Sequence, residues 1–110
     1  MYVKVCQEDD LWEGGTVMGA AGDHRIIVVW PEGGTPTAFQ GICPHRGVPL
    51  DGASLSGIEL TCPQHMWTFD GESGDSLDPP GCALARYPMK IEDGVVLVDT
   101  DGIMPMTADF

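Results

Sequence analysis

The sequence predicts an all-β fold, and three features of its 110 residues support that prediction. Fifteen glycines and nine prolines break the chain into short segments, as in proteins built from short strands and tight turns. The segments between these breaks contain many β-branched residues, which favour strands. No stretch shows the apolar period of a long helix. Many strands with short connections indicate an antiparallel arrangement.

Four strands are expected in the first forty residues, at 2–6, 16–20, 25–30 and 37–40. Residues 26–30 form a continuous apolar run, which should lie in the core of the sheet. Residues 8–13 should make one helical turn ended by glycine, with Trp12 as a lid on the core. His24 lies in a turn with no Cys or His beside it in sequence, so we expect a solvated side chain.

The rest of the chain is predicted to contribute strands at 58–61, 67–69, 89–92 and 95–99. The last two flank Asp93-Gly94, which is the strongest hairpin signal in the sequence because both residues tolerate a positive φ. Turn-forming residues make up 70–75 and 78–81. The tail, residues 100–110, should lie over the sheet or fray.

The chain carries 17 acidic and 5 basic side chains, a formal net charge of −12. Such a surface repels phosphate backbones and anionic lipids, so neither nucleic acid nor a membrane is an expected partner. Two interpretations of the charge stay open. It serves solubility alone, or it steers the protein toward a basic patch on a partner protein.

No apolar run approaches the length of a membrane span, and residues 1–10 lack the apolar core of a secretory signal. We therefore expect a cytoplasmic protein with reduced thiols. Two of the four cysteines, Cys6 and Cys82, should then be buried apolar residues or bystanders. A disulfide between them is the less favoured alternative.

Two short loops offer a set of metal ligands. Cys43-x-His45 is followed after sixteen residues by Cys62-x-x-His65. Two thiolates and two imidazoles can bind a zinc ion or an iron–sulfur cluster. Structural zinc sites usually bring their cysteines in one C-x(2–4)-C knuckle, whereas here each loop supplies one Cys and one His. That division suits a two-iron centre in which one iron takes two Cys and the other two His, so the cluster is favoured over zinc.

This ligand pattern resembles the Rieske iron–sulfur motif. The resemblance implies one Rieske [2Fe–2S] cluster held by Cys43, His45, Cys62 and His65. It also implies a single domain, residues 1–110, with the Rieske fold. An antiparallel β-sandwich or barrel-like base, 1–40 and 83–110, would carry a small inserted cluster-binding subdomain, about 41–82.

Other residues are expected around the cluster. Gly47 and Gly81 would let backbone N–H groups approach the sulfurs. Pro80 belongs to Asp78-Pro-Pro-Gly81, which resembles the proline-rich loop that covers the cluster in Rieske proteins. Arg46 is either a solvated side chain or a contact to an acidic rim on a partner. Trp67 is either a packing wall for the cluster or a buried core residue.

The loops depart from the respiratory and photosynthetic Rieske proteins, which carry an extra disulfide and a serine that hydrogen-bonds the cluster. Val48 and Gln64 stand where the two extra cysteines would be, and Trp67 stands where the serine would be. Without these groups we expect a potential at the low end of the Rieske range, about −150 to 0 mV. Such a potential suits a carrier downstream of NADH.

The whole chain is similar to the Rieske ferredoxins of toluene-type di-iron monooxygenases. The matching features are Cys6 with Asp9-Asp10-Leu11-Trp12, F-Q-G-I-C-P-H from Phe39, H-M-W-T-F from His65, Cys82 with Tyr87-Pro88, and Gly102-Ile-Met-Pro105. The similarity implies a one-electron carrier that is not itself an enzyme and is a monomer when free. It would pass electrons from an NADH-dependent flavin/iron–sulfur reductase to a di-iron hydroxylase that oxidises an aromatic or an alkene.

Three alternatives stay open at this point. A ferredoxin of a ring-hydroxylating dioxygenase has the same cofactor but commonly a glycine in place of Trp67. The Rieske-like small subunit of a nitrite reductase often lacks the cluster ligands. A zinc-stabilised interaction module would use the Cys2His2 set structurally and would be colourless.

Overall fold

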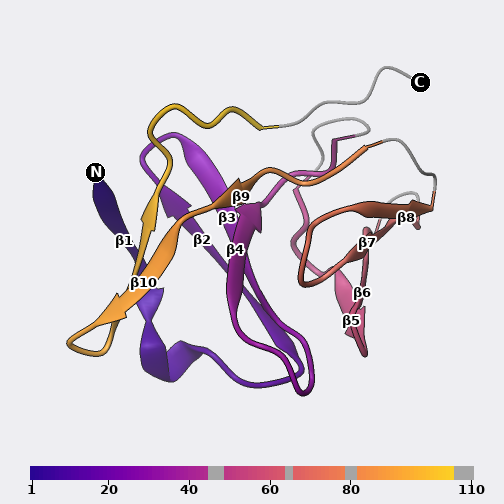
Figure 1. Ribbon diagram of the computed structural model, residues 1–110, viewed down its shortest axis with the longest axis horizontal. Coiled ribbons are helices and arrows are strands. Elements are labelled where there is room, and N and C mark those ends of the chain that lie inside the picture. The colour runs from indigo at the N-terminus through magenta and orange to yellow at the C-terminus, as the bar shows by residue number, and fades with distance from the viewer. Residues whose placement is uncertain (45–48, 64–65, 79–81, 106–110) are drawn as a thin grey trace.

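The computed structural model describes residues 1–44, 49–63, 66–78 and 82–105. Within these ranges the regular structure is almost entirely strand, arranged in three antiparallel sheets (Figure 1). The prediction of an all-β fold is confirmed. Among the described residues, no helix is long and apolar enough to cross a membrane.

The first sheet joins the two ends of the chain. It contains β1 (Tyr2–Gln7), β11 (Val95–Asp99) and β10 (Met89–Glu92), in the order β1-β11-β10. β10 and β11 form the expected hairpin, whose turn residues Asp93 and Gly94 have φ values of 53° and 75°. A turn with two positive φ angles matches the twist of the strands that it connects.

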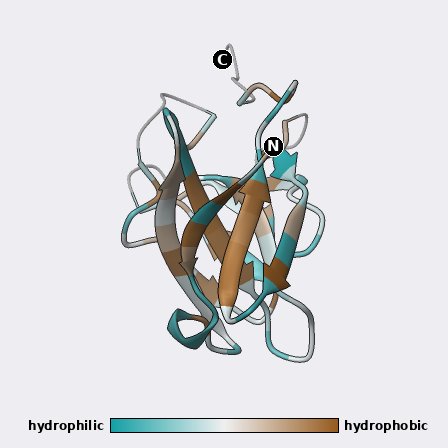
Figure 2. Cartoon of the chain, turned by 90° about the vertical axis from the view of Figure 1, so that its left-hand side faces the viewer, coloured by the Kyte–Doolittle hydropathy of each residue, from teal (hydrophilic) through white to brown (hydrophobic). Residues whose placement is uncertain are grey.

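The second sheet has the order β2-β3-β4-β9, with β2 (Gly15–Ala21), β3 (His24–Trp30), β4 (Thr37–Gln40) and β9 (Arg86–Tyr87). In β3 the first four residues of the apolar run, 26–29, are fully buried, because successive side chains point to opposite faces and both faces are covered, while Trp30 is half-buried. Ile27 and Val29 pack in one core, and Ile26 and Val28 pack in the other. Figure 2 shows hydrophobic stretches along the strands and hydrophilic turns at their ends.

The third sheet comes entirely from residues 54–78 and lies beside the other two (Figure 1). Its strands are β5 (Ser54–Ser56), β6 (Glu59–Thr61), β7 (Thr68–Asp70) and β8 (Ser76–Asp78), paired in sequence order. The sequence predicted β6 and β7 but not β5 or β8. Each missed strand has one apolar residue between serines or beside an aspartate, a composition that is typical of turns.

Two aromatic side chains differ from the prediction. Trp12 is 56% exposed and does not cover the core; its ring lies on Gly15, where a methyl group would come within 1.9 Å of Cε2. The expected helical turn is only a 3-10 turn, η1 (Glu8–Asp10), and it ends at extended Leu11 rather than at glycine. The chain therefore turns away before Trp12 can reach the interior.

His24 is half-buried rather than solvated. It pairs with Ala21 across the two-residue turn between β2 and β3, which places its ring edge-on to Tyr87 at a centroid distance of 5.9 Å. The Tyr87 hydroxyl lies 3.5 Å from Nδ1. In the tail, Ile103 packs against the second core, and residues 106–110 lie outside the described part of the chain.

The four cysteines are free, so the Cys6–Cys82 disulfide alternative is wrong. Cys6 is buried in β1, where burial and the nearby negative charge of Asp10 raise the pKa of its thiol. Cys82 is partly exposed.

Candidate metal centre

The first ligand loop leaves β4 through Gln40 and Gly41. Gly41 N donates to Arg25 O at 2.7 Å, so the loop begins directly against β3. A methyl group on Gly41 would lie 3.0 Å from backbone carbons of Arg25 and Ile26, a separation that leaves no room for a side chain. The loop returns at residues 49–50, where Leu50 N donates to Gly41 O at 2.8 Å. Cys43 is thus carried on a loop that is closed at its base.

Gln40 is a residue that the sequence analysis missed. It is fully buried, and its amide nitrogen donates to Ile42 O at 2.8 Å, while its amide oxygen accepts from Ala85 N at 2.8 Å. The side chain therefore joins the residue before Cys43 to the segment after β8 on the far side of the site. The sequence carries no signal for this role, because the burial of the amide and its bond to Ala85 depend on contacts between distant segments.

The second ligand loop connects β6 to β7. Cys62 N donates to Trp67 O at 2.7 Å, and Met66 N donates to Cys62 O at 3.2 Å. This closure requires a left-handed residue, and Met66 takes it with φ of 59°. Trp67 follows and is 8% exposed in the core.

Cys43 and Cys62 meet in the same core, with exposures of 1% and 0%. The structure therefore places the two thiols, which the sequence puts in separate loops, in one hydrophobic core. Trp67 belongs to the same core, as the buried-residue interpretation expected. The other members are apolar, namely Ile27, Val29, Phe39, Leu50, Leu60, Phe69 and Leu84.

The remaining predicted site residues lie outside the described part of the chain. They are His45, Arg46, Gly47, Gln64, His65, Pro80 and Gly81. Among the residues that are described, no group of three or more His, Cys, Asp or Glu side chains could hold a metal ion. The ligand set therefore stays a prediction, of which the structure describes the two cysteines.

A third segment closes the site beside β7 and β8. The Asp70 carboxylate accepts from the backbone of Glu72 and Ser73 at 2.8 and 3.0 Å, which shapes the turn between these strands. Gly74, at φ of 84°, then donates its N–H to Asp70 O and accepts from Leu84 N, both at 2.8 Å. A methyl group on Gly74 would come within 2.9 Å of Leu84 O. The turn therefore presses the 82–85 segment onto the core that contains both thiols.

Two buried thiols with no disulfide between them fit an iron–sulfur cluster. Thiolates are the ligands that such clusters use, and a thiolate in an apolar interior is stable only when a metal balances its charge. No described residue from 41 to 44, 49 to 50, 62 to 63 or 66 to 67 carries a charged side chain. A metal centre bound between the two loops would supply the balancing positive charge that two thiolates need there.

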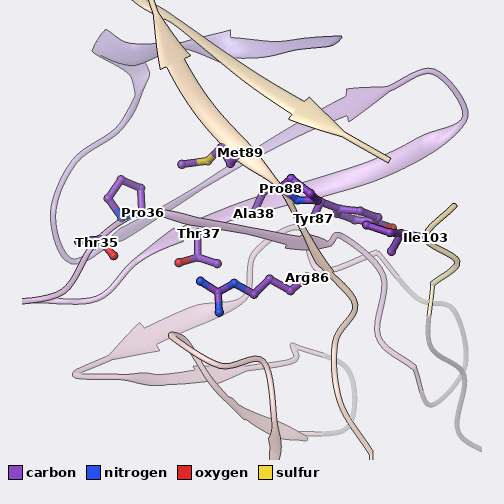
Figure 3. A pocket seen from close by; sticks show the side chains of 9 residues that line it. All are labelled: Thr35, Pro36, Thr37, Ala38, Arg86, Tyr87, Pro88, Met89 and Ile103. Atoms are coloured by element: carbon purple, nitrogen blue, oxygen red, sulfur yellow. The ribbon is translucent and has the colours of Figure 1, made fainter. Parts of the chain in front are cut away.

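Two open cavities lie elsewhere on the described surface. One, of about 400 Å³, is bounded by β4, β9 and the tail, with Arg86 and Thr37 among its lining residues (Figure 3). The other, of about 460 Å³, is bounded by the turn between β2 and β3. Neither Cys43 nor Cys62 lines either cavity.

Comparison with known proteins places this site in a family. Residues 1–88 match the model of the Rieske [2Fe–2S] domain. The chain is 39% identical over 101 residues to the alkene monooxygenase system ferredoxin component of Xanthobacter autotrophicus, covering 91% of this chain and 82% of the relative. It is 27% identical over 99 residues to the naphthalene 1,2-dioxygenase system ferredoxin component of Pseudomonas putida, covering 89% and 94%.

Two of the solved structures with a similar fold are ferredoxins. A ferredoxin of Sphingomonas yanoikuyae B1 matches with a TM-score of 0.77 and 25% identity, covering 90% of this chain and 98% of the other. The ferredoxin of carbazole 1,9a-dioxygenase from Nocardioides aromaticivorans IC177 matches with a TM-score of 0.76 and 24% identity, covering 89% and 96%.

Proposed function

The chain belongs to the Rieske [2Fe–2S] domain family, and on that premise we propose that it is the electron carrier of an oxygenase system. Its cofactor is one Rieske [2Fe–2S] cluster. The observation that carries the proposal is the burial of Cys43 and Cys62 in one hydrophobic core. Each cysteine lies in a loop that also offers a histidine as a second ligand. The chain is a ferredoxin component and not itself the oxygenase.

In this proposal Cys43 and Cys62 hold one iron, and His45 and His65 hold the other. When bound, the cluster supplies one-electron chemistry at a potential that the two imidazoles raise above that of all-cysteine clusters. The burial of both cysteines and their family motif support this assignment. Arg46, Gly47, Gln64, Trp67, Pro80 and Gly81 are proposed to surround it.

The protein's own contribution is a rigid and dry enclosure. Gln40 and Gly41 fix the first loop against β3 and Ala85, and the backbone bonds between Cys62 and Trp67 fix the second. Fixed ligands reorganise little between two oxidation states, which favours fast electron transfer. The apolar residues of the first core exclude water from the thiol side.

We propose that the chain receives electrons from a flavin/iron–sulfur reductase that oxidises NADH. It then passes them to a di-iron hydroxylase that acts on an alkene or an aromatic. The alkene monooxygenase ferredoxin, at 39% identity, supports this assignment over a ring-hydroxylating dioxygenase, whose naphthalene ferredoxin is 27% identical. Trp67, where those dioxygenase ferredoxins commonly carry glycine, supports the same choice. The dioxygenase ferredoxin is the second candidate, supported by the similarity to the naphthalene 1,2-dioxygenase system ferredoxin component.

We further propose a monomeric cytoplasmic protein with a single domain, residues 1–110, in which about 41–82 form the cluster-binding part. Four free cysteines support a reducing compartment. The sheet formed by 54–78 alone supports the division into a base and an inserted part.

Reconstitution tests the assignment. The purified ferredoxin is mixed with NADH and with the reductase and oxygenase of one system. That system is either the Xanthobacter autotrophicus alkene monooxygenase or the naphthalene 1,2-dioxygenase. We expect oxygenase turnover with the alkene system that depends on the ferredoxin. Turnover with the dioxygenase alone would establish the second candidate, and turnover with neither would contradict the proposal.

A further inference from the structure

The cavity bounded by β4, β9 and the tail is a feature that the proposed electron transfer does not use. Its volume is about 400 Å³, which is within the range of small-molecule sites. Figure 3 shows side chains from three separate segments, residues 35–38, 86–89 and 103, gathered around it. None of these side chains is acidic, although the chain carries 17 acidic residues. The lining of the cavity therefore does not repel an anion.

The register between β4 and β9 places a cation and a hydroxyl group on one face of the sheet. Arg86 pairs with Phe39, and Thr37 precedes Phe39 by two residues on the same strand. Because successive side chains point to opposite faces, Arg86 and Thr37 share a face and are diagonal neighbours. Figure 3 shows both side chains on the same side of β4, with the guanidinium group reaching toward Thr37. These two groups form a charged end of the cavity.

Within the described ranges, neither group has a polar partner. The Thr37 hydroxyl makes no hydrogen bond there, although Thr37 is only 7% exposed. Arg86 has no ion pair there, whereas Arg25 pairs with Asp51 at 3.3 Å. Buried hydroxyl groups are normally hydrogen-bonded, and the guanidinium fork matches the two oxygens of a carboxylate. A carboxylate bound here would supply the missing partner to both groups.

The opposite end of the cavity is apolar. Ala38 and Tyr87 point to the other face of the same two strands, and both belong to the second core. Met89 and Ile103 are partly buried and pack against that core. In Figure 3, Met89 and Arg86 lie on opposite sides of β4. A ligand that fills the cavity therefore needs an apolar body beside its charged group.

We propose that this cavity binds a small organic carboxylate with an apolar body. Its carboxylate accepts hydrogen bonds from Arg86 and Thr37, and its apolar part lies against Met89 and Ile103. The net charge of −12 disfavours anions at long range, but at physiological ionic strength salt screens charges more than about 8 Å apart. Neither Cys43 nor Cys62 lines the cavity, so the inference is independent of the proposed function.

Isothermal titration of the oxidised holoprotein with hexanoate, at physiological salt, tests the ligand class. We expect saturable binding with a Kd of about 1 mM or tighter. Acetate lacks the apolar body and hexanamide lacks the charge, so each should bind at least about tenfold more weakly. No saturable binding of hexanoate, or equal binding of hexanamide or acetate, would overturn the inference.

Substitutions test the place of binding. Arg86→Gln and Thr37→Val each remove one of the two polar groups, and each should raise the Kd of hexanoate about tenfold. Arg25→Gln is the matched control, because it removes the same charge from the lining of the other cavity, and it should stay within about twofold of wild type. Wild-type affinity in both R86Q and T37V, or an equal loss in R25Q, would overturn the inference.

EPR spectra and melting temperatures show which variants are folded holoproteins. If R86Q does not fold, T37V alone decides, because it replaces the hydroxyl by a methyl group of similar size. The proposed function stands whatever the outcome, since none of these measurements involves a reductase or an oxygenase.

Discussion

At the scale of single residues, Gln40 links the two sides of the site through its buried amide. The amide nitrogen and oxygen bond to Ile42 and Ala85, which are far apart in sequence. Buried polar groups of the backbone are costly when they lose such partners, since water cannot replace them. One side chain thus holds the entrance of the first ligand loop against the segment that closes the opposite wall.

Gln40→Leu should therefore lower the free energy of unfolding by about 3 kcal/mol, because it removes the hydrogen-bond partners of the half-buried Ile42 O and the buried Ala85 N. Urea denaturation of the holoprotein measures the change. Thr37→Val is the control, since Thr37 is also buried in β4 but its hydroxyl has no hydrogen bond to the described residues. It should change stability by less than about 1 kcal/mol. Equal effects of the two substitutions would contradict the role of Gln40.

At the scale of elements, β3 organises the molecule because its alternating side chains enter two cores. The sequence predicted this strand and its burial from one continuous apolar run, and the prediction is confirmed. The hairpin at Asp93-Gly94 was also predicted correctly, because the tolerance of these two residues for a positive φ depends only on the residues themselves.

Elements that depend on distant contacts were not predictable in the same way. β5 and β8 have the composition of turns and are strands only because β6 and β7 pair with them. Trp12 was expected in the core, but its position depends on where the 3-10 turn ends. It also depends on Gly15, whose lack of a side chain lets the Trp12 ring lie against its backbone. Local patterns carry no information about such contacts between segments.

The turn between β7 and β8 offers a test at this scale. Gly74 and Gly57 both have positive φ, at 84° and 59°, but only Gly74 is crowded, by Phe39 and Leu84 O. Gly57→Ala should cost about 1 kcal/mol of stability for the backbone conformation alone. Gly74→Ala should cost about 3 kcal/mol, because overpacking adds to that strain.

Urea denaturation measures both changes, and iron content per chain shows whether the crowded variant still assembles the site. Equal costs at Gly57 and Gly74 would mean that the turn does not press on the core as described.

At the scale of the whole molecule, the four cysteines should differ in reactivity. Cys82 is partly exposed, whereas Cys6 is buried and burial raises the pKa of its thiol. Cys43 and Cys62 are proposed as ligands. A thiol reagent should therefore modify one cysteine quickly in the native holoprotein, because only Cys82 is both accessible and unligated.

Removal of the iron with a chelator should make two more cysteines reactive, and mass mapping of the modified peptides should identify them as Cys43 and Cys62. The Cys82→Ser variant is the control, and it should lose the fast reaction of the native protein. Rapid modification of Cys43 or Cys62 in the native holoprotein would contradict their assignment as ligands.

The candidate site was predictable from the sequence to the extent that its ligands recur in short motifs. Cys43 and Cys62 were named from their spacing, and the structure brings them into one core. The support around them was not predictable, because Gln40, Gly41 and Gly74 act through Ala85, Arg25 and Leu84, which lie far away in sequence. The burial of a thiol or an amide is a property of the assembled sheets.

The central claim, a cluster with two cysteine and two histidine ligands, is tested most directly by the EPR spectrum of the dithionite-reduced protein. We predict a rhombic signal whose average g value lies below that of all-cysteine [2Fe–2S] clusters, together with a red-brown oxidised form. The signal should change toward the all-cysteine type in His45→Cys. A colourless protein with bound zinc, or a wild-type spectrum retained in His45→Cys, would contradict the account.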